Sequence, residues 1–274
     1  MIGTWNMDSI SQEDFYTHVK NTVESYRSGM KSFDVELFNS NTVDPIKLIL
    51  DKSIYQKDWQ TIVSDEVLRQ RDKGNNNSIG YFHQNIFRYI DNCEVPQAGW
   101  DVIYTNPNGV DIGDGTRVST IYVEMKNKHN TMNSASAART YSKAQQQLLE
   151  DDDSACFLVE AIAKKSQNIP WGVSVDGQHR SHKLIRRVSM DQFFKIVTGD
   201  RLAFWKVCQA LPETIEKVIE DLDTTPAPYD TVYDGLVEIG NASGRGFVDA
   251  LYLLGFSSYI GFGDIQSEET GLSE

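Results

Sequence analysis

Glu124 and Lys126 are the residues of this sequence whose types and spacing most directly indicate chemistry. A single residue, Met125, separates them in the run VEMK. On a β-strand, residues i and i+2 project from the same face, so the two side chains would point together while Met125 points away. A carboxylate beside a lysine suits metal-assisted phosphodiester hydrolysis, because the carboxylate binds Mg²⁺ and the lysine orients or deprotonates the attacking water. Taken alone, such a tripeptide more often marks a solvated strand face.

One carboxylate makes a weak magnesium site, and hairpin geometry predicts where a second one lies. Two segments rich in strand-forming residues, 99–106 and 117–126, flank the turn sequence DIGDG. If they pair, the midpoint between Asp101 and Glu124 falls inside that turn, and the two residues lie side by side, about 5 Å apart. We therefore predict that Asp101 and Glu124 bind Mg²⁺ and that Lys126 activates water.

The turn itself contains two rival carboxylates, Asp111 and Asp114. Both would lie at the tip of the hairpin, roughly 33 Å along the strand from Glu124. Asp101 is therefore the first choice, and Asp111 is the second choice if the turn lies elsewhere.

The segments before residue 90 have mainly helical patterns. Apolar residues recur at helical spacing in residues 11–30, and Asp44 followed by Pro45 is typical of a helix start. Residues 59–71 and 79–90 are also predicted to be helical, with a polar loop at 73–78 between them.

After residue 90 strands and helices alternate. A helix is predicted at 133–150 and a strand buried on both faces at 156–163, which together with the strand at 117–126 would make a βαβ unit with a parallel pair. The remaining predicted elements are a hairpin of 171–175 with 183–189 and helices at 190–198, 201–210 and 212–222. The expected fold class is α/β, a mixed sheet flanked by helices.

Composition divides the chain into three expected segments: a mainly helical part at 1–90, a core at 91–211 and an acidic, mainly helical part at 212–274. We expect them to pack as one continuous domain. The net charge is −13, but the chain from Leu211 onward carries thirteen acidic residues against two basic ones. Because local patches decide nucleic-acid binding, the total charge does not exclude a DNA partner.

Two basic segments are candidate DNA contacts. No acidic residue occurs from Met125 to Leu149, and a second group of cations surrounds the predicted hairpin. Lysine and arginine bind phosphates, and arginine also reads guanine in the major groove. The candidate DNA-binding residues are Asn127, Lys128, His129, Asn130, Arg139, Lys143, Arg180, Lys183, Arg186 and Arg187. A solvated hairpin with surface cations is an equally good interpretation of the second group.

The run VEMKNKHNTMNS, with IGYFHQNIF and GWDV upstream, resembles type II restriction endonucleases of the PD-(D/E)XK fold. It looks most like the group that cuts GGNCC, over roughly residues 44–211. The resemblance implies Mg²⁺-dependent double-strand cleavage of DNA at a short palindrome by a homodimer. It also implies a cognate methyltransferase as a partner in the system. By position, Asp101 and Glu124 match the two acids of the motif and Lys126 matches its lysine.

The sequence departs from this pattern at two places. Trp100, not proline, precedes Asp101. Many members of the fold also carry a glutamate on an N-terminal helix that faces the metal, whereas the comparable segment 79–90 offers His83 and Gln84. The resemblance therefore adds Gln84 to the predicted catalytic set, as an uncharged group that accepts a hydrogen bond from metal-bound water.

Other features bound the class of protein. No apolar run approaches the roughly 20 residues of a membrane span, the N-terminus does not resemble a signal peptide, and three scattered cysteines indicate a reduced, cytoplasmic protein. Three alternatives to a restriction enzyme remain: a repair or junction nuclease of the same fold, a non-catalytic DNA-binding module, and a structural protein with an accidental ExK.

Overall fold

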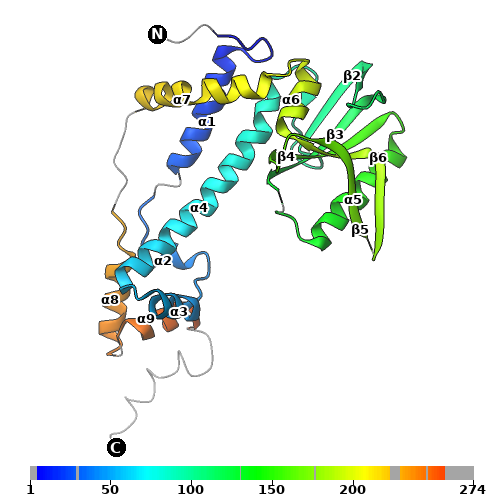
Figure 1. The fold of residues 1–274 in the computed structure, drawn as a ribbon. Helices are drawn as coiled ribbons and strands as arrows, with labels where there is room; N and C mark the ends of the chain where they lie inside the picture. The colour runs from blue at the N-terminus through cyan, green and yellow to red at the C-terminus, as the bar shows by residue number, and fades with distance from the viewer. Residues whose placement is uncertain are drawn as a thin grey trace, which may run out of the picture. The chain divides into compact units, whose positions relative to one another are not determined.

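The computed structural model describes residues 5–28, 31–129, 131–175, 177–222, 229–244 and 246–256 (Figure 1). The chain forms two compact units: unit 1 comprises Met1–Ser25 with Asn77–Thr224, and unit 2 comprises Tyr26–Asn76 with Thr225–Glu274. These boundaries differ from the expected ones at 90 and 211, because the N-terminal helical region is divided between the two units.

Unit 1 is built on one six-stranded mixed sheet in the order β1-β2-β3-β4-β6-β5. The pairs β2–β3 and β5–β6 are antiparallel, while β3–β4 and β4–β6 are parallel. The strands are β1 (Cys93–Glu94), β2 (Val102–Asp111), β3 (Arg117–Lys128), β4 (Ser154–Ile162), β5 (Asn168–Val175) and β6 (Gln178–Ser189). The predicted α/β class, the parallel βαβ pair and the hairpin near residue 177 are confirmed.

Helices flank this sheet on both faces. One face, carrying Val123, Phe157 and Val188, packs with residues of α1, α4, α6 and α7; the other face packs against α5. The strand β4 is buried over nearly its whole length, as expected for a central strand with both faces covered. The helices of unit 1 are α1 (Gln12–Ser28), the end of α4 (Trp59–Asn85), the 3₁₀ helix η1 (Ile86–Tyr89), α5 (Ser134–Glu150), α6 (Met190–Thr198) and α7 (Ala203–Asp221).

The helix α5 matters most for the site, and its start is fixed locally. The side chain of Asn133 accepts a hydrogen bond from the backbone N–H of Ser136 and caps the first turn. Tyr141 and Ala144 are buried against the sheet, and Cys156 on β4 donates to the carbonyl of Ala144. The buried face of α5 is therefore anchored on the sheet.

Unit 2 is helical. Its elements are α2 (Val35–Asn39), α3 (Pro45–Tyr55), the first part of α4, α8 (Val232–Ala242) and α9 (Phe247–Phe256). The helix start predicted at Asp44 is confirmed, because its side chain accepts from the N–H groups of Ile46 and Lys47. The apolar core centres on Phe38, Leu48, Val63, Leu236 and Leu251.

Two predicted helix breaks were wrong. The polar segment 73–78 is helical and lies inside α4, and Pro212 lies inside α7. Asparagine, glycine and proline disfavour a helix by up to about 3 kcal/mol, but burial of flanking residues such as Val207 and Val218 outweighs that preference. Within the described residues no helix is long and apolar enough to span a membrane.

Candidate active site

Asp101 lies directly before β2, beside Glu124 on β3. The backbone N–H of Asp101 donates to the carbonyl of Val123 at 2.9 Å, and the next pair in the ladder joins Val102 to Val123. The N–H of Met125 donates to Asp101 Oδ2 at 2.6 Å. A register shift between Thr105 and Val110 changes the pairing nearer the turn but leaves the Asp101 end in the register that the hairpin geometry predicted.

Glu124 and Lys126 project from the face of β3 that α5 covers. Tyr122, two residues earlier on the strand, packs in the α5-side cluster, whereas Val123 and Met125 pack on the other side. The Nζ of Lys126 donates to Glu124 Oε1 at 2.7 Å. Both side chains remain partly exposed, 19% for Glu124 and 29% for Lys126, so the pair is reachable from solvent.

A second lysine reaches the same carboxylate from α5. Lys143 Nζ donates to Glu124 Oε2 at 3.1 Å and to the carbonyl of Gly99 at 2.7 Å, and it lies 3.9 Å from the centre of the Trp100 ring. Sequence reasoning had assigned Lys143 to DNA binding. The structure instead brings it to Glu124, and no strand or turn pattern indicates such a contact because it depends on the rotation of α5.

The two carboxylates have opposite electrostatic settings. Burial raises the pKa of Asp101, with a further rise from the charge of Glu124, and the Met125 N–H partly opposes this. Burial also acts to raise the pKa of Glu124, but the hydrogen bonds and charges of Lys126 and Lys143 outweigh it and hold that pKa below its ordinary value. Cations therefore stabilise the ionised form of Glu124.

Gln84 and His83 lie near the end of α4. Gln84 Nε2 donates to the backbone carbonyl of Asp101 at 3.1 Å, so this side chain contacts the first carboxylate's own residue. Burial lowers the pKa of His83 to about 4, which keeps the imidazole neutral at neutral pH.

The rival carboxylates of the β2–β3 turn are engaged in holding that turn. Asp111 Oδ1 accepts from the N–H groups of Gly113 and Gly115 at 2.7 and 3.0 Å. Asp114 accepts from Thr116 and pairs with Arg186 at 2.6 Å. Both carboxylates therefore stabilise the β2–β3 turn, and neither lies beside Glu124 in the strand register.

The predicted DNA-binding residues differ in their exposure to solvent. Asn130 lies outside the described residues, and Asn127 and Arg180 are half-buried. Lys128, Arg139 and Lys183 are exposed and free to approach a phosphate.

Arg186 lies in the interior, contrary to what a base-reading role requires. Its side chain is 3% exposed, donates to Asn168 Oδ1 and to the Asn168 carbonyl, and pairs with Asp114. These bonds join β6 to β5 and to the β2–β3 turn. Contact with DNA would require them to break, so the geometry supports a structural role.

Arg187 and His129 converge on a carboxylate that sequence reasoning missed, Glu160 on β4. Arg187 Nη2 donates to Glu160 Oε1, and His129 Nδ1 lies 3.1 Å from both Glu160 oxygens. Glu160 is 2% exposed and is the register partner of Lys126 across the parallel pair. A lone acid within the apolar run of β4 is the signal that could have found it, because a buried charge needs a partner.

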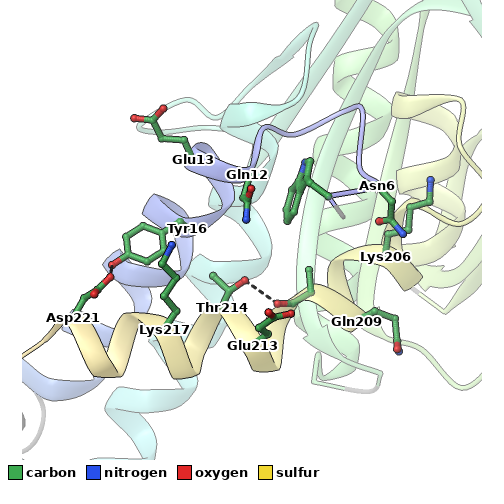
Figure 2. Close-up of a pocket in the computed structure, with 12 residues that line it drawn as sticks. Asn6, Gln12, Glu13, Tyr16, Lys206, Gln209, Glu213, Thr214, Lys217 and Asp221 are labelled. Carbon is green, nitrogen blue, oxygen red and sulfur yellow. Dashed lines mark hydrogen bonds between the residues drawn. The ribbon is translucent and has the colours of Figure 1, made fainter. Parts of the chain in front are cut away.

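A hollow of about 630 Å³ lies in unit 1 between the N-terminal segment, α1 and α7 (Figure 2). Tyr16 donates to Asp221 at 2.6 Å, and Lys217 lies 5.3 Å from the Tyr16 ring. Its lining mixes acids, bases and amides and includes none of the predicted catalytic residues.

Comparison with known proteins places the chain among restriction endonucleases. A family model described as Eco47II restriction endonuclease matches residues 7–220. The type II restriction enzyme Sau96I of Staphylococcus aureus is 27% identical over 264 residues, which cover 92% of this chain and 97% of that protein. The type II restriction enzyme Eco47II of Escherichia coli is 25% identical over 227 residues, or 78% of this chain and 89% of that protein.

Proposed function

The chain belongs to the Eco47II restriction endonuclease family, and from this premise we propose how its own residues cleave DNA. It is a type II restriction endonuclease with site-specific activity on DNA. We assign Asp101 and Glu124 as ligands of Mg²⁺ and Lys126 as the group that activates water. The observation that carries this assignment is the pairing of Asp101 and Glu124 at one end of the β2–β3 hairpin, with Lys126 bonded to Glu124.

The donor set fits a hard divalent cation. Two carboxylates lie close enough for the charge of Glu124 to raise the pKa of Asp101, and such a pair attracts a cation. Among the described residues no group of three or more His, Cys, Asp and Glu side chains forms a metal site. Mg²⁺ usually keeps several waters and binds through one or two carboxylates and substrate phosphates, which this pair would allow. When bound, Mg²⁺ would polarise the phosphate and offset developing negative charge.

Lys126 is the proposed activator of the nucleophile. Its ammonium lies 2.7 Å from Glu124 Oε1, at the open edge of the site. From there it can orient a water molecule toward a phosphorus atom and stabilise the charge that develops on the equatorial oxygens. Gln84 binds the Asp101 main chain through its amide nitrogen, and its carbonyl oxygen is the proposed acceptor for a water proton.

Recognition is proposed to use exposed and half-buried cations. Lys128 and Arg139 follow the catalytic strand, and Arg180 and Lys183 lie on the β5–β6 hairpin. Asn127 and His129, at the end of β3, would act from the same edge, and Asn130, outside the described residues, is proposed to contact DNA as well. We propose GGNCC as the site, a homodimer as the active form, a separate methyltransferase as the protecting enzyme and the cytoplasm as the place of action.

Digestion of phage DNA with purified protein and Mg²⁺ tests the proposal. Wild type should give discrete bands, and Glu124→Ala and Lys126→Ala should each reduce the cleavage rate by about 10³-fold or more, because residues that act as a unit fail together. Asp111→Ala is the matched control, since it removes the second-choice carboxylate from the same hairpin. Loss of bands in Asp111→Ala with cutting retained in Glu124→Ala would reverse the assignment.

A further inference from the structure

Lys143 is held at a fixed place in the site by three contacts. Its Nζ donates to the Gly99 carbonyl and to Glu124 Oε2, and it lies over the Trp100 ring. Trp100 is fixed in turn, because its Nε1 donates to Gln147 Oε1 at 2.9 Å. Residues four apart on a helix share a face, so Lys143 and Gln147 both contact the segment of Gly99 and Trp100. The ammonium is therefore a positioned charge.

This arrangement also accounts for a tryptophan directly before Asp101. The indole face supplies a cation–π contact for Lys143, and its N–H anchors the segment to α5. Since Lys143 contacts Glu124 with the same ammonium, one helix holds both carboxylate-bearing segments.

The charges around Glu124 balance. Asp101 and Glu124 contribute two carboxyl groups, and Lys126 and Lys143 contribute two ammonium groups that bind the two oxygens of Glu124 separately. A DNA phosphate is also an anion, so carboxylates without counter-charges would repel it. Removing one lysine leaves an excess of negative charge where the phosphate must lie.

We propose that Lys143 is a charge-balancing positioning residue, which neutralises Glu124 in the metal-free protein so that the site accepts a DNA phosphate before a divalent ion. The inference rests on the proposed function, because it takes Asp101 and Glu124 as the cleavage site. Once Glu124 coordinates a divalent ion, the charge of that ion replaces the contribution of Lys143. The residue therefore matters most for DNA binding without metal.

The test compares DNA affinity in EDTA and in Ca²⁺, measured by fluorescence anisotropy with a labelled duplex that carries the sequence the protein cleaves. Lys143→Met should weaken binding by about tenfold in EDTA, because the uncompensated charge of Glu124 would repel the phosphate, and by less than about twofold in Ca²⁺. Lys143→Arg, which keeps the charge, should stay near wild type in both. The double variant Glu124→Gln/Lys143→Met should return the EDTA affinity toward wild type.

Lys217→Met is the matched control, since it removes an ammonium group from an aromatic ring elsewhere in unit 1. It should leave the ratio of the EDTA and Ca²⁺ affinities unchanged. Equal weakening of Lys143→Met in both conditions would mark an ordinary phosphate contact and overturn the proposal, as would no weakening. If Lys143→Met lowers the thermal midpoint of unfolding, the double variant Glu124→Gln/Lys143→Met provides the test. The proposal is then overturned when this double variant does not recover DNA affinity in EDTA.

Failure of the proposed function gives a different result, because that function is tested by cleavage in Mg²⁺ and this inference by binding without cleavage. Wild type that binds DNA but never cuts it would remove the cleavage mechanism. Wild type that cuts, with unchanged metal-free affinity in Lys143→Met, would remove only the role of Lys143.

Discussion

Two glutamates on neighbouring parallel strands face α5, and their partners differ. Glu124 on β3 is 19% exposed and binds two lysines, whereas Glu160 on β4 is 2% exposed and binds Arg187 with His129 beside it. The register places Glu160 directly across from Lys126. The same residue type, on the same face of one sheet, is therefore held in two different ways.

The two glutamates differ in how readily their cationic partners can be displaced. Lysine presents a point charge on a flexible stem and exchanges readily, while arginine presents a planar fork that holds a carboxylate in one geometry. Glu124 can exchange its ammonium groups for a metal ion at an open edge. Glu160 is buried beside a half-buried arginine. It contacts His129 at the end of β3, and the backbone N–H of His129 donates to the Ile162 carbonyl at 2.9 Å.

The largest expected effect separates the two glutamates by activity. Glu124→Gln should reduce cleavage by about 10³-fold or more, since it removes a proposed metal ligand, while leaving the unfolding midpoint nearly unchanged. Glu160→Gln, assayed below its own unfolding temperature, should keep activity within about tenfold, the lower end of what a supporting group costs. Single-turnover rates in Mg²⁺ measure both. Equal loss in the two variants would erase the distinction.

The next effect separates them by stability. Glu160→Gln should lower the free energy of unfolding by about 3 kcal/mol, because it breaks an ion pair whose carboxylate is buried and leaves the half-buried Arg187 without its charge partner. Urea denaturation followed by circular dichroism measures this, with Glu124→Gln as the control. A change below about 1 kcal/mol would show that Glu160 is better solvated than its burial indicates.

A smaller effect tests the geometry of the fork. Arg187→Lys keeps the charge but loses the planar donor set, so it should cost about 1 kcal/mol in urea denaturation, the value of one net hydrogen bond. Lys143→Arg at the other glutamate provides the contrast, because a contact through a point charge should tolerate the exchange. A larger loss in Lys143→Arg than in Arg187→Lys would invert the comparison.

The smallest effect concerns the edge of β3 beyond both glutamates. Lys128 is exposed, so Lys128→Ala should weaken DNA binding uniformly across sequences and reduce the slope of log affinity against log salt by about 1. Arg186→Ala should leave that slope unchanged when the protein is folded, since Arg186 is buried against Asn168 and Asp114. DNA affinity measured over a range of salt concentrations gives both slopes. A reduced slope in Arg186→Ala with an unchanged slope in Lys128→Ala would contradict the prediction.

Short-range patterns predicted the β2–β3 hairpin well. The turn sequence DIGDG and the alternation of β3 predicted Asp101 beside Glu124, because hairpin pairing depends on the turn and the strand period. The structure reaches that register through an irregularity between Thr105 and Val110, which the sequence pattern did not indicate. The start of α3 at Asp44 followed from capping for the same reason.

Contacts between distant elements could not be predicted in this way. The contact of Lys143 with Glu124 depends on how α5 packs. Alternation along β6 places Arg186 and Arg187 on opposite faces but does not indicate that each forms an ion pair with a distant carboxylate. The continuity of α4 through 73–78 and of α7 through Pro212 depends on tertiary burial, which outweighs local propensity.

The central claim is that Asp101, Glu124 and Lys126 cut DNA at one short sequence. Digestion of phage DNA in Mg²⁺ followed by sequencing of the fragment ends tests it most directly. Wild type should produce ends at the same position within a single palindrome, GGNCC, and Glu124→Ala and Lys126→Ala should produce none. Ends scattered over unrelated sequences, or the same ends from both variants, would contradict the account.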